Sequence, residues 1–423
     1  MTVAASDICD AAYDVIVIGG GPAGSTTAAL LAEYGHRVLL LERESMPRYH
    51  VGESLIPYTW HTLNRLGVLD QMHQSANPKK YSVQFVSLTG EVSQPFYFFQ
   101  TIKHECAVTW QVQRSEFDTM LLDNARAKGA EIQQGRHVRD VLMDGNSVVG
   151  VQYDEVGGRK GLEARSRCVV DCSGRDSLLS RRFGWRERDP ELNKIAVWSY
   201  YKGARRDPGL DAGATTVAYV PHKGWFWYIP LPDDVVSVGV VGEADYLYRD
   251  TRDVEAILDR EVQSCKWVHE HVRDAERCEP VMVTGEYSYS SSHIATDGLC
   301  LVGDAFSFLD PLFSSGVFLA LKGGEIAADT IHQGLLDDDL SGARFDAYLA
   351  QARGAVKSFR ELVLAFYDES FSFREFLDAY PHLHSKIVDT LVGNVFTDLD
   401  PLYTALAEFK VRTTRDEVAA TSA

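Results

Sequence analysis

A glycine-rich loop near the start of the chain has the residue types and spacing to hold a dinucleotide. Gly19, Gly21 and Gly24 satisfy the pattern GxGxxG, and Glu42 follows 18 residues after Gly24. The first glycine permits a tight turn, the second lets the backbone approach a pyrophosphate, and the third allows close contact between helix and strand. A carboxylate at Glu42 can bind the hydroxyls of a ribose. The loop therefore predicts a dinucleotide-binding site.

Apolar runs around the loop predict the elements that position it. An apolar strand at 14–18, a helix at 22–35 and a second strand at 37–42 form a βαβ unit. The same pattern returns late in the chain, where an apolar run at 299–302 is followed by a helical pattern at about 314–332. We therefore predict an α/β protein whose Rossmann-like domain is discontinuous in sequence.

A second sheet and a helical region are predicted from the remaining patterns. Alternating or aromatic segments between Gly, Pro and Asp turns predict antiparallel strands at 81–88, 194–203, 214–220, 225–231 and 235–241. Helical patterns dominate residues 342–393. The predicted division assigns 1–80, 111–184 and 285–335 to the nucleotide domain, 81–110 and 185–284 to a substrate-side sheet domain, and 336–423 to a helical C-terminal region.

The composition excludes several classes of function. The 423 residues carry a net charge of -18, which repels phosphate backbones, so we expect no nucleic-acid binding. No apolar run is long enough to span a bilayer, and the first residues lack the basic and apolar regions of a signal peptide. The seven cysteines form no CxxC pair, which predicts reduced thiols, a cytoplasmic location and no metal site.

Several short segments extend the dinucleotide prediction to FAD. Gly303-Asp304, after an apolar strand, resembles the second FAD motif of the aromatic-hydroxylase-like flavoproteins, in which the Asp holds the ribityl chain. Residues 171–174 and the segment around Arg114 resemble further motifs of that superfamily, in the same order along the chain. The resemblance implies FAD as the cofactor, bound by Gly19, Gly21, Ala23, Gly24, Glu42, Arg43, Ser54, Arg114, Asp304, Pro311, Gly316 and Val317.

Two longer segments resemble the signature of the flavin-dependent halogenases. Residues 225–230 read Trp-Phe-Trp-Tyr-Ile-Pro, which matches WxWxIP, and residues 308–316 match FxxPxxSxG. Residues 52–54 resemble the GES segment of the halogenase branch. The resemblance implies an FADH2-dependent oxidoreductase that uses O2 and chloride or bromide to halogenate an electron-rich aromatic ring. The sequence contains no second GxGxxG for a nicotinamide cofactor, which suggests that a separate flavin reductase supplies reduced FAD.

The halogenase resemblance also assigns roles to individual residues. In this family, hypohalous acid moves through a tunnel to a lysine, which holds it by hydrogen bonding or as a chloramine. Lys80, five residues before Phe85, fits the family spacing, and the neighbouring Lys79 is the alternative. Ser315 and Gly316 are the predicted halide-binding residues, although their loop could instead only cradle the isoalloxazine ring.

Trp225 and Trp227 are predicted to keep an organic substrate away from the flavin, which favours attack by halide over hydroxylation. Their spacing of two residues is also that of an ordinary inward-facing stripe on a strand. The resemblance therefore gives these two side chains a role that spacing alone does not distinguish from core packing.

The substrate and partners are also implied by the resemblance. The compact form resembles the branch that acts on pyrrole or phenol rings, and it implies a pyrrole tethered as a thioester to an acyl or peptidyl carrier protein. Residues 159–188 carry nine Lys or Arg and four acids, which predicts either a docking patch for the carrier or a solvated charged face with Arg175 near the cofactor. The alternative functions are an FAD-dependent aromatic hydroxylase or reductase, and a non-catalytic flavin-binding partner in an assembly.

Overall fold

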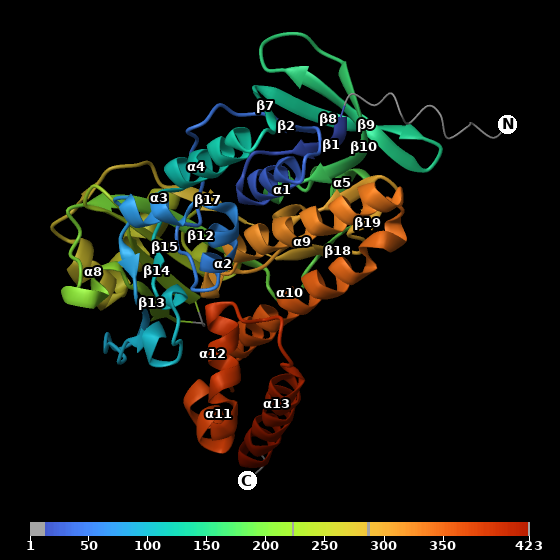
Figure 1. Ribbon diagram of the computed structural model, residues 1–423. Helices are drawn as coiled ribbons and strands as arrows, with labels where there is room; N and C mark the ends of the chain where they lie inside the picture. The colour runs from blue at the N-terminus through green and yellow to red at the C-terminus, as the bar shows by residue number, and fades with distance from the viewer. Residues whose placement is uncertain (1–12, 222–223, 286–287, 422–423) are drawn as a thin grey trace.

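Two large sheets and a C-terminal group of helices make up the fold (Figure 1). The computed structural model describes residues 13–221, 224–285 and 288–421. Within these ranges, no helix has the length and apolar character needed to cross a membrane, and all six cysteines are free, while Cys9 lies outside them. The helices at the lower end of Figure 1 are α11 (Phe373–Ala379), α12 (His384–Val392) and α13 (Asp400–Thr421).

The first sheet presents the glycine loop at one edge. Strand β1 (Tyr13–Ile18) pairs in parallel with β10 (Leu162–Asp171) and with β2 (Val38–Glu42), and β10 pairs in parallel with β20 (Leu299–Leu301), so the carboxyl ends of these strands meet. Strand β2 is buried along its whole length, as expected for a parallel strand covered on both faces. The strand order is β19 (Ala295–Thr296), β20 (Leu299–Leu301), β10 (Leu162–Asp171), β1 (Tyr13–Ile18), β2 (Val38–Glu42) and β7 (Glu131–Gln134), with the hairpin of β8 (Arg136–Asp144) and β9 (Ser147–Glu155) joined to β10.

Helices α1 (Pro22–Glu33) and α9 (Gly316–Asp337) lie side by side against this sheet (Figure 1). A proline suits the first turn of α1, where its missing N–H has no intrahelical partner. Gly324 permits the close approach of the two helices, because a Cβ atom there would lie 2.7 Å from the carbonyl oxygen of Ala23. The predicted βαβ unit and the predicted late helix are both confirmed.

The second sheet contains all five strands predicted for it, but it is mixed rather than wholly antiparallel. Strand β4 (Ser82–Val86) runs parallel to β13 (Thr215–Val220), while the other pairs are antiparallel. The strand order is β16 (Glu276–Arg277), β12 (Lys194–Lys202), β15 (Val235–Glu243), β14 (Gly224–Pro230), β13 (Thr215–Val220), β4 (Ser82–Val86) and β5 (Phe96–Tyr97), with β17 (Met282–Thr284) also paired to β12.

Strand β14 carries WxWxIP and is buried on both faces. Trp225, Trp227 and Ile229 face one side, where helix α10 (Asp346–Tyr367) packs. Phe226 and Tyr228 face the other side, where α7 (Val254–Ser264) and α8 (Lys266–Val272) pack. The alternation follows from the two-residue period of a strand, so the tryptophans share one face of the sheet.

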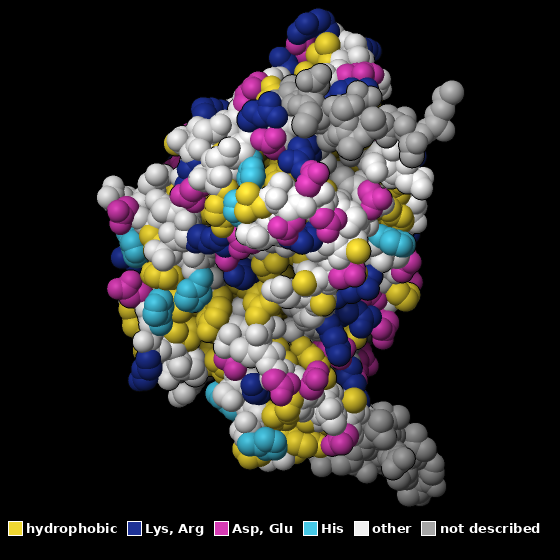
Figure 2. Space-filling model, turned by 45° about the vertical axis from the view of Figure 1, so that its right-hand side comes forward, with side chains coloured by type: hydrophobic (Ala, Val, Ile, Leu, Met, Phe, Trp, Pro, Cys, Tyr) yellow, Lys and Arg dark blue, Asp and Glu magenta, His cyan; other side chains and the backbone are white. Residues whose placement is uncertain are grey.

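Short ladders connect the two sheets. Strands β3 (Lys79–Lys80) and β6 (Thr109–Trp110) pair with each other, next to the predicted crossings between domains at 80/81 and 110/111. A three-stranded ladder joins β11 (Arg186–Arg188), β18 (Tyr289–Ser291) and β21 (Ser307–Phe308). The predicted domain boundaries remain predictions. Figure 2 shows basic and acidic side chains interspersed over the face that it draws, with hydrophobic side chains gathered near its centre.

Candidate active site

A cavity lies between the two sheets and brings together segments that are far apart in the sequence. Gly24, Lys80 and Ser315 do not line it. The other residues predicted from the sequence all do: Gly19, Gly21, Ala23, Glu42, Arg43, Ser54, Arg114, Asp304, Pro311, Gly316, Val317, Trp225 and Trp227.

The three glycines of the loop have different positions relative to this cavity. Gly19 has a φ of +97°, and a Cβ atom there would collide with the carbonyl oxygen of Cys172. A Cβ atom on Gly24 would collide with the carbonyl oxygen of Gly19, so Gly24 serves close packing rather than ligand contact. Beside Gly21, the nearest atom to a Cβ would be Nη2 of Arg48, at 3.4 Å. The middle glycine therefore leaves its backbone open to the cavity.

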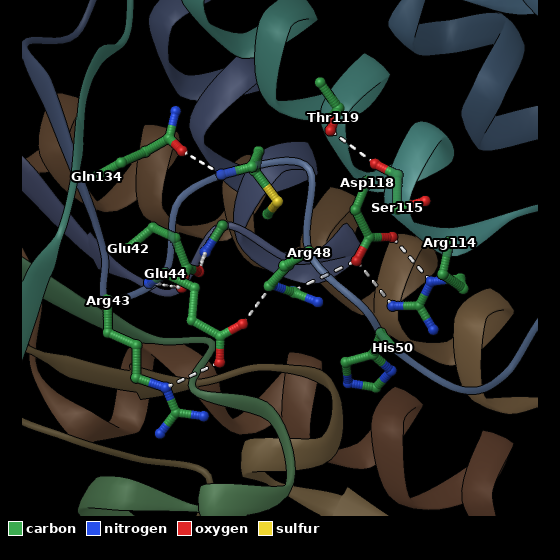
Figure 3. A network of polar contacts seen from close by, with 12 residues as sticks. Glu42, Arg43, Glu44, Arg48, His50, Arg114, Ser115, Asp118, Thr119 and Gln134 are labelled. Carbon is green, nitrogen blue, oxygen red and sulfur yellow. Dashed lines mark hydrogen bonds and ion pairs between the residues drawn. The ribbon is translucent and has the colours of Figure 1, made fainter. Parts of the chain in front are cut away.

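Two arginines share one buried carboxylate beside the loop (Figure 3). The Arg114 guanidinium, at the start of α4 (Arg114–Ala127), donates to both oxygens of Asp118, from Nε at 2.8 Å and Nη2 at 3.0 Å. Nη2 of Arg48 lies 3.3 Å from the same carboxylate. Asp118 is fully buried, so the arginines supply the charge that a buried carboxylate needs.

Arg48 is a functional candidate that the sequence interpretation missed. Its Nη1 atom is buried and has no hydrogen-bond partner among the described residues. The side chain lines the cavity beside Gly21, where the GxGxxG pattern expects a pyrophosphate. A buried guanidinium with a spare donor suits a phosphate oxygen. This open donor and the exposed backbone of Gly21 fit the diphosphate of FAD.

Two carboxylates fit the sugar parts of FAD. Glu42, at the end of β2, accepts the backbone N–H of Gly20 at 2.6 Å and that of Glu44 at 2.8 Å. These bonds fix the carboxylate at the cavity edge (Figure 3), where a ribose hydroxyl can reach it. Asp304 follows β20, and burial raises the pKa of its carboxyl to about 6, against the opposing influence of Arg175 and Arg114.

Lys80 and Lys79 have opposite environments on the two-residue strand β3. Lys79 is exposed, whereas Lys80 is only 1% exposed. The Lys80 Nζ atom donates to Ser54 Oγ at 2.8 Å and to the carbonyl oxygen of Leu55 at 3.1 Å. Burial lowers the pKa of this ammonium to about 7. A lysine in this state is a positioned hydrogen-bond donor that also has access to its neutral form.

Ser54 is the link between Lys80 and the cavity. Its hydroxyl lies 2.9 Å from Oγ1 of Thr215, and both residues line the cavity. Lys80 is therefore separated from the cavity by the side chain of Ser54. The strand alternation that buries Lys80 also points Lys79 away from Ser54.

The two tryptophans are held by hydrogen bonds as well as by packing. Trp225 donates from Nε1 to Oη of Tyr367 at 2.8 Å, and Tyr367 donates in turn to Asp310 Oδ2 at 2.8 Å. Trp227 donates to Ser237 Oγ at 3.0 Å. A Cβ atom on Gly239 of the neighbouring strand would collide with the indole ring of Trp227. The wall is thus fixed from the sheet and from helix α10.

The loop of residues 308–316, which is predicted to bind halide, presents Ser314 and Gly316 to the cavity, whereas Ser315 does not line it. Ser314 has a φ of +55°, and this left-handed turn leaves the Ser315 side chain buried before α9 begins. A Cβ atom on Gly316 would meet none of the described residues within 4 Å. The first N–H groups of α9 have no intrahelical acceptors, and a helix N-terminus favours an anion. The loop therefore has the features of a halide site, with Gly316 at its open end.

Glu53 is a second residue that the sequence interpretation left without a role. It lies in the GES segment, lines the cavity and is 2% exposed. Tyr200 Oη donates to its carboxylate at 2.5 Å, and Tyr49 Oη lies 3.1 Å from Tyr200 Oη. Burial raises the pKa of the Glu53 carboxyl. The GES match was the available signal, but only tertiary packing reveals that this carboxyl is buried.

Comparisons with known proteins agree with this geometry. The family model described as "FAD binding domain" matches residues 12–332. The chain is 32% identical to a chlorinase of 1H-pyrrole-2-carbonyl-peptidyl-carrier protein from Pseudomonas fluorescens, over 91% of this chain and 90% of the relative. It is also 32% identical to the corresponding brominase from Pseudoalteromonas luteoviolacea, over 91% of this chain and 92% of the relative.

Solved structures of halogenases share the whole architecture. The flavin-dependent brominase Bmp2 superposes with a TM-score of 0.84 at 31% identity, over 96% of this chain and 99% of that one. The myxobacterial chondrochloren halogenase CndH superposes with a TM-score of 0.79 at 32% identity, over 95% and 96% of the two chains. The predicted fold class, FAD cofactor and enzyme class are confirmed. The chain belongs to the flavin-dependent halogenase family of FAD-dependent oxidoreductases.

Proposed function

We propose that this enzyme halogenates a pyrrole ring held as a thioester on an acyl or peptidyl carrier protein, with Lys80 delivering hypohalous acid. The observation that carries the proposal is the buried Lys80 ammonium, bonded to Ser54 at 2.8 Å behind the wall of the flavin cavity. When bound, reduced FAD would supply two of the four electrons that reduce O2, and chloride or bromide would supply the other two, so that the products are hypohalous acid and water.

The residues around the cavity divide the remaining tasks. Arg48 and the Gly21 backbone would hold the diphosphate, and Glu42 a ribose. Trp225 and Trp227 fill the wall between the flavin cavity and helix α10 and would exclude an organic ring. Halide, which is far smaller, would reach the loop at Gly316. This division favours oxidation of a halide over hydroxylation of the ring.

Lys80 then has a defined chemical task. Its Nζ would donate a hydrogen bond to the oxygen of hypohalous acid, which polarises the halogen–oxygen bond. The ring attacks the halogen, a carbon–halogen bond forms and the halogen–oxygen bond breaks. The ring proton leaves with the oxygen as water, so hypohalous acid and arene give haloarene and water. The low pKa of Lys80 lets the group donate and release a proton near neutral pH.

Partners follow from the same proposal. Two similar proteins are named for substrates on a peptidyl carrier protein, which supports a carrier as the partner here. The single GxGxxG motif supports a separate flavin reductase as the source of FADH2. The free thiols of the described residues support a cytoplasmic location.

The basic segment at 159–188 is not part of this proposal. Arg167 pairs with Asp338, and Arg182 pairs with Asp140, so acids from outside the segment offset its positive charge. Arg175 lines the cavity, as the second sequence interpretation expected. These contacts favour a solvated charged face near the cofactor over a carrier-docking patch.

The test is a product assay with separately reduced FAD, O2, chloride or bromide, and free or carrier-bound pyrrole-2-carboxylate, read by mass spectrometry. Lys80→Ala should give no halogenated ring while reduced FAD is still oxidised. Lys79→Ala removes the exposed neighbour and should keep wild-type product formation, which makes it the matched control. Product at the normal rate from Lys80→Ala would refute the role of Lys80, and a hydroxylated ring from the wild type would refute the halogenation.

A further inference from the structure

Three metal-ligating side chains meet on the surface away from the FAD cavity. His61 lies in α2 (Thr59–Leu66), His104 immediately precedes the short helix η3 (Glu105–Ala107), and Cys106 lies within η3. One donor atom from each residue lies within 4.8 Å of the others. Both histidines are exposed, whereas Cys106 is buried. Imidazole nitrogen and thiolate sulfur together are the donors that Zn²⁺ prefers.

Aromatic packing holds the two histidines in this arrangement. Their rings are stacked with centroids 5.5 Å apart at 29°. Trp60 packs edge-on against both, with its ring centroid 5.4 Å from His61 and 4.8 Å from His104. His104 Nδ1 accepts the backbone N–H of Cys106 at 3.1 Å, which orients its ring across the cysteine. Coordination through Nδ1 exchanges this one hydrogen bond for a metal–nitrogen bond.

The charges around the cluster permit a cation. His61 would bind a metal as the neutral imidazole, and Lys322 on α9 lies close enough to His61 to interact with it electrostatically. Lys322 is itself paired with Glu325 at 2.7 Å, so the neighbouring charges on α9 largely cancel. Cys106 would lose its thiol proton to the buffer and bind as thiolate.

The donor spacing is close to that of a tetrahedral site. Zinc–nitrogen bonds of about 2.0 Å and zinc–sulfur bonds of about 2.3 Å separate neighbouring donors by roughly 3.3–3.6 Å. Because the donor atoms already lie within 4.8 Å of one another, small shifts of the side chains bring them to this spacing. A solvent molecule would complete the four ligands.

We propose that His61, His104 and Cys106 form a surface site for Zn²⁺ that fastens α2 to η3. The backbone beside this site frames Lys80. The carbonyl oxygen of Leu55 accepts a hydrogen bond from the Lys80 ammonium, and the Leu55 N–H donates to the carbonyl oxygen of Trp110 at 3.1 Å. Trp110 lies in β6, which pairs with the strand that carries Lys80. Zinc would therefore hold the segment from Leu55 to α2 against the segment from η3 to β6, and both segments contact Lys80 or its strand. The inference is independent of the proposed halogenation, because the site lies outside the FAD cavity.

The experiment is a zinc titration of the FAD-loaded protein, after chelator treatment and under reducing conditions, in competition with a chromophoric chelator. One Zn²⁺ per chain should bind, and the thermal midpoint of unfolding should rise with the zinc concentration. His61→Ala, His104→Ala and Cys106→Ser should each weaken binding by more than about 10-fold. His269→Ala and Cys278→Ser, which remove an exposed histidine and an exposed cysteine elsewhere, should leave it unchanged.

A direct view of the ligands makes the result independent of how the variants fold. X-ray absorption at the zinc edge of the wild type should show one sulfur neighbour, lost in Cys106→Ser, and imidazole scattering. Binding without a sulfur neighbour, no stoichiometric binding at a tenfold excess of zinc, or wild-type affinity in all three variants would each overturn the proposal.

Discussion

Replacing Lys80 by Met should make the protein more stable near neutral pH while it abolishes halogenation. Met is similar in length and carries no charge. Lys80 is 1% exposed, and burial lowers the pKa of its ammonium from 10.5 to about 7. A difference of about 3.5 between the two pKa values corresponds to roughly 5 kcal/mol of folding free energy. Loss of the hydrogen bonds to Ser54 and Leu55 offsets about 1–3 kcal/mol of this gain.

The pH dependence has a definite sign. The unfolded chain keeps the Lys80 proton up to about pH 10.5, whereas the folded protein releases it near pH 7. Between these values the unfolded chain binds more protons, so the free energy of unfolding rises with pH. From pH 6 to pH 9 this group alone should add about 2–3 kcal/mol to the wild type. The variant with Met lacks that contribution.

Urea unfolding at pH 6 and pH 9 with saturating FAD, followed by circular dichroism, measures the difference. The midpoint of Lys80→Met should lie above that of the wild type at pH 6, and the gap should shrink at pH 9. Lys79→Met changes only an exposed side chain and should follow the wild type at both pH values. A midpoint for Lys80→Met at or below the wild type at pH 6 would refute the claim that this ammonium is strongly desolvated.

Three further changes test the rest of the site. Arg48→Met removes the spare buried donor and should weaken FAD binding by about 10- to 100-fold, measured by flavin fluorescence titration. Gly239→Ala drives a methyl group into the Trp227 ring and should lower the free energy of unfolding by about 1–3 kcal/mol, seen as a lower urea midpoint. Tyr367→Phe removes the hydrogen-bond donor to the buried Asp310 carboxylate and should lower the free energy of unfolding by about 1–3 kcal/mol. An unchanged thermal midpoint of unfolding would count against a stabilising role of this hydrogen bond.

Local patterns were enough to predict the nucleotide-binding half of the fold. The GxGxxG spacing predicted that Gly19 and Gly24 must lack a side chain, and in the structure a Cβ atom at either position would collide with backbone. The alternating residue pattern predicted the strand that carries WxWxIP and its neighbouring strands. The parallel pairing of β4 with β13 was missed, because strand direction depends on a connection of more than a hundred residues rather than on the pattern within either strand.

The chemistry of individual site residues depends on tertiary contacts between segments that are distant in the sequence. Arg48 and Glu53 sit in irregular segments, and only tertiary packing buries them beside the cavity. Whether Ser314 or Ser315 lines the cavity depends on one left-handed residue, which the motif does not specify. The cluster of His61, His104 and Cys106 was missed because His61 is more than forty residues from the other two, and the three share no CxxC-like spacing.

Whether Lys80 holds the oxidant can be measured by separating oxidation of the halide from addition of the ring substrate. The enzyme is mixed with reduced FAD, O2 and bromide without a ring substrate, free methionine is added to destroy any oxidant in solution, and carrier-bound pyrrole is supplied last. We predict brominated pyrrole from the wild type and from Lys79→Ala, and none from Lys80→Ala. Equal product from Lys80→Ala, or no product from the wild type, would contradict this prediction.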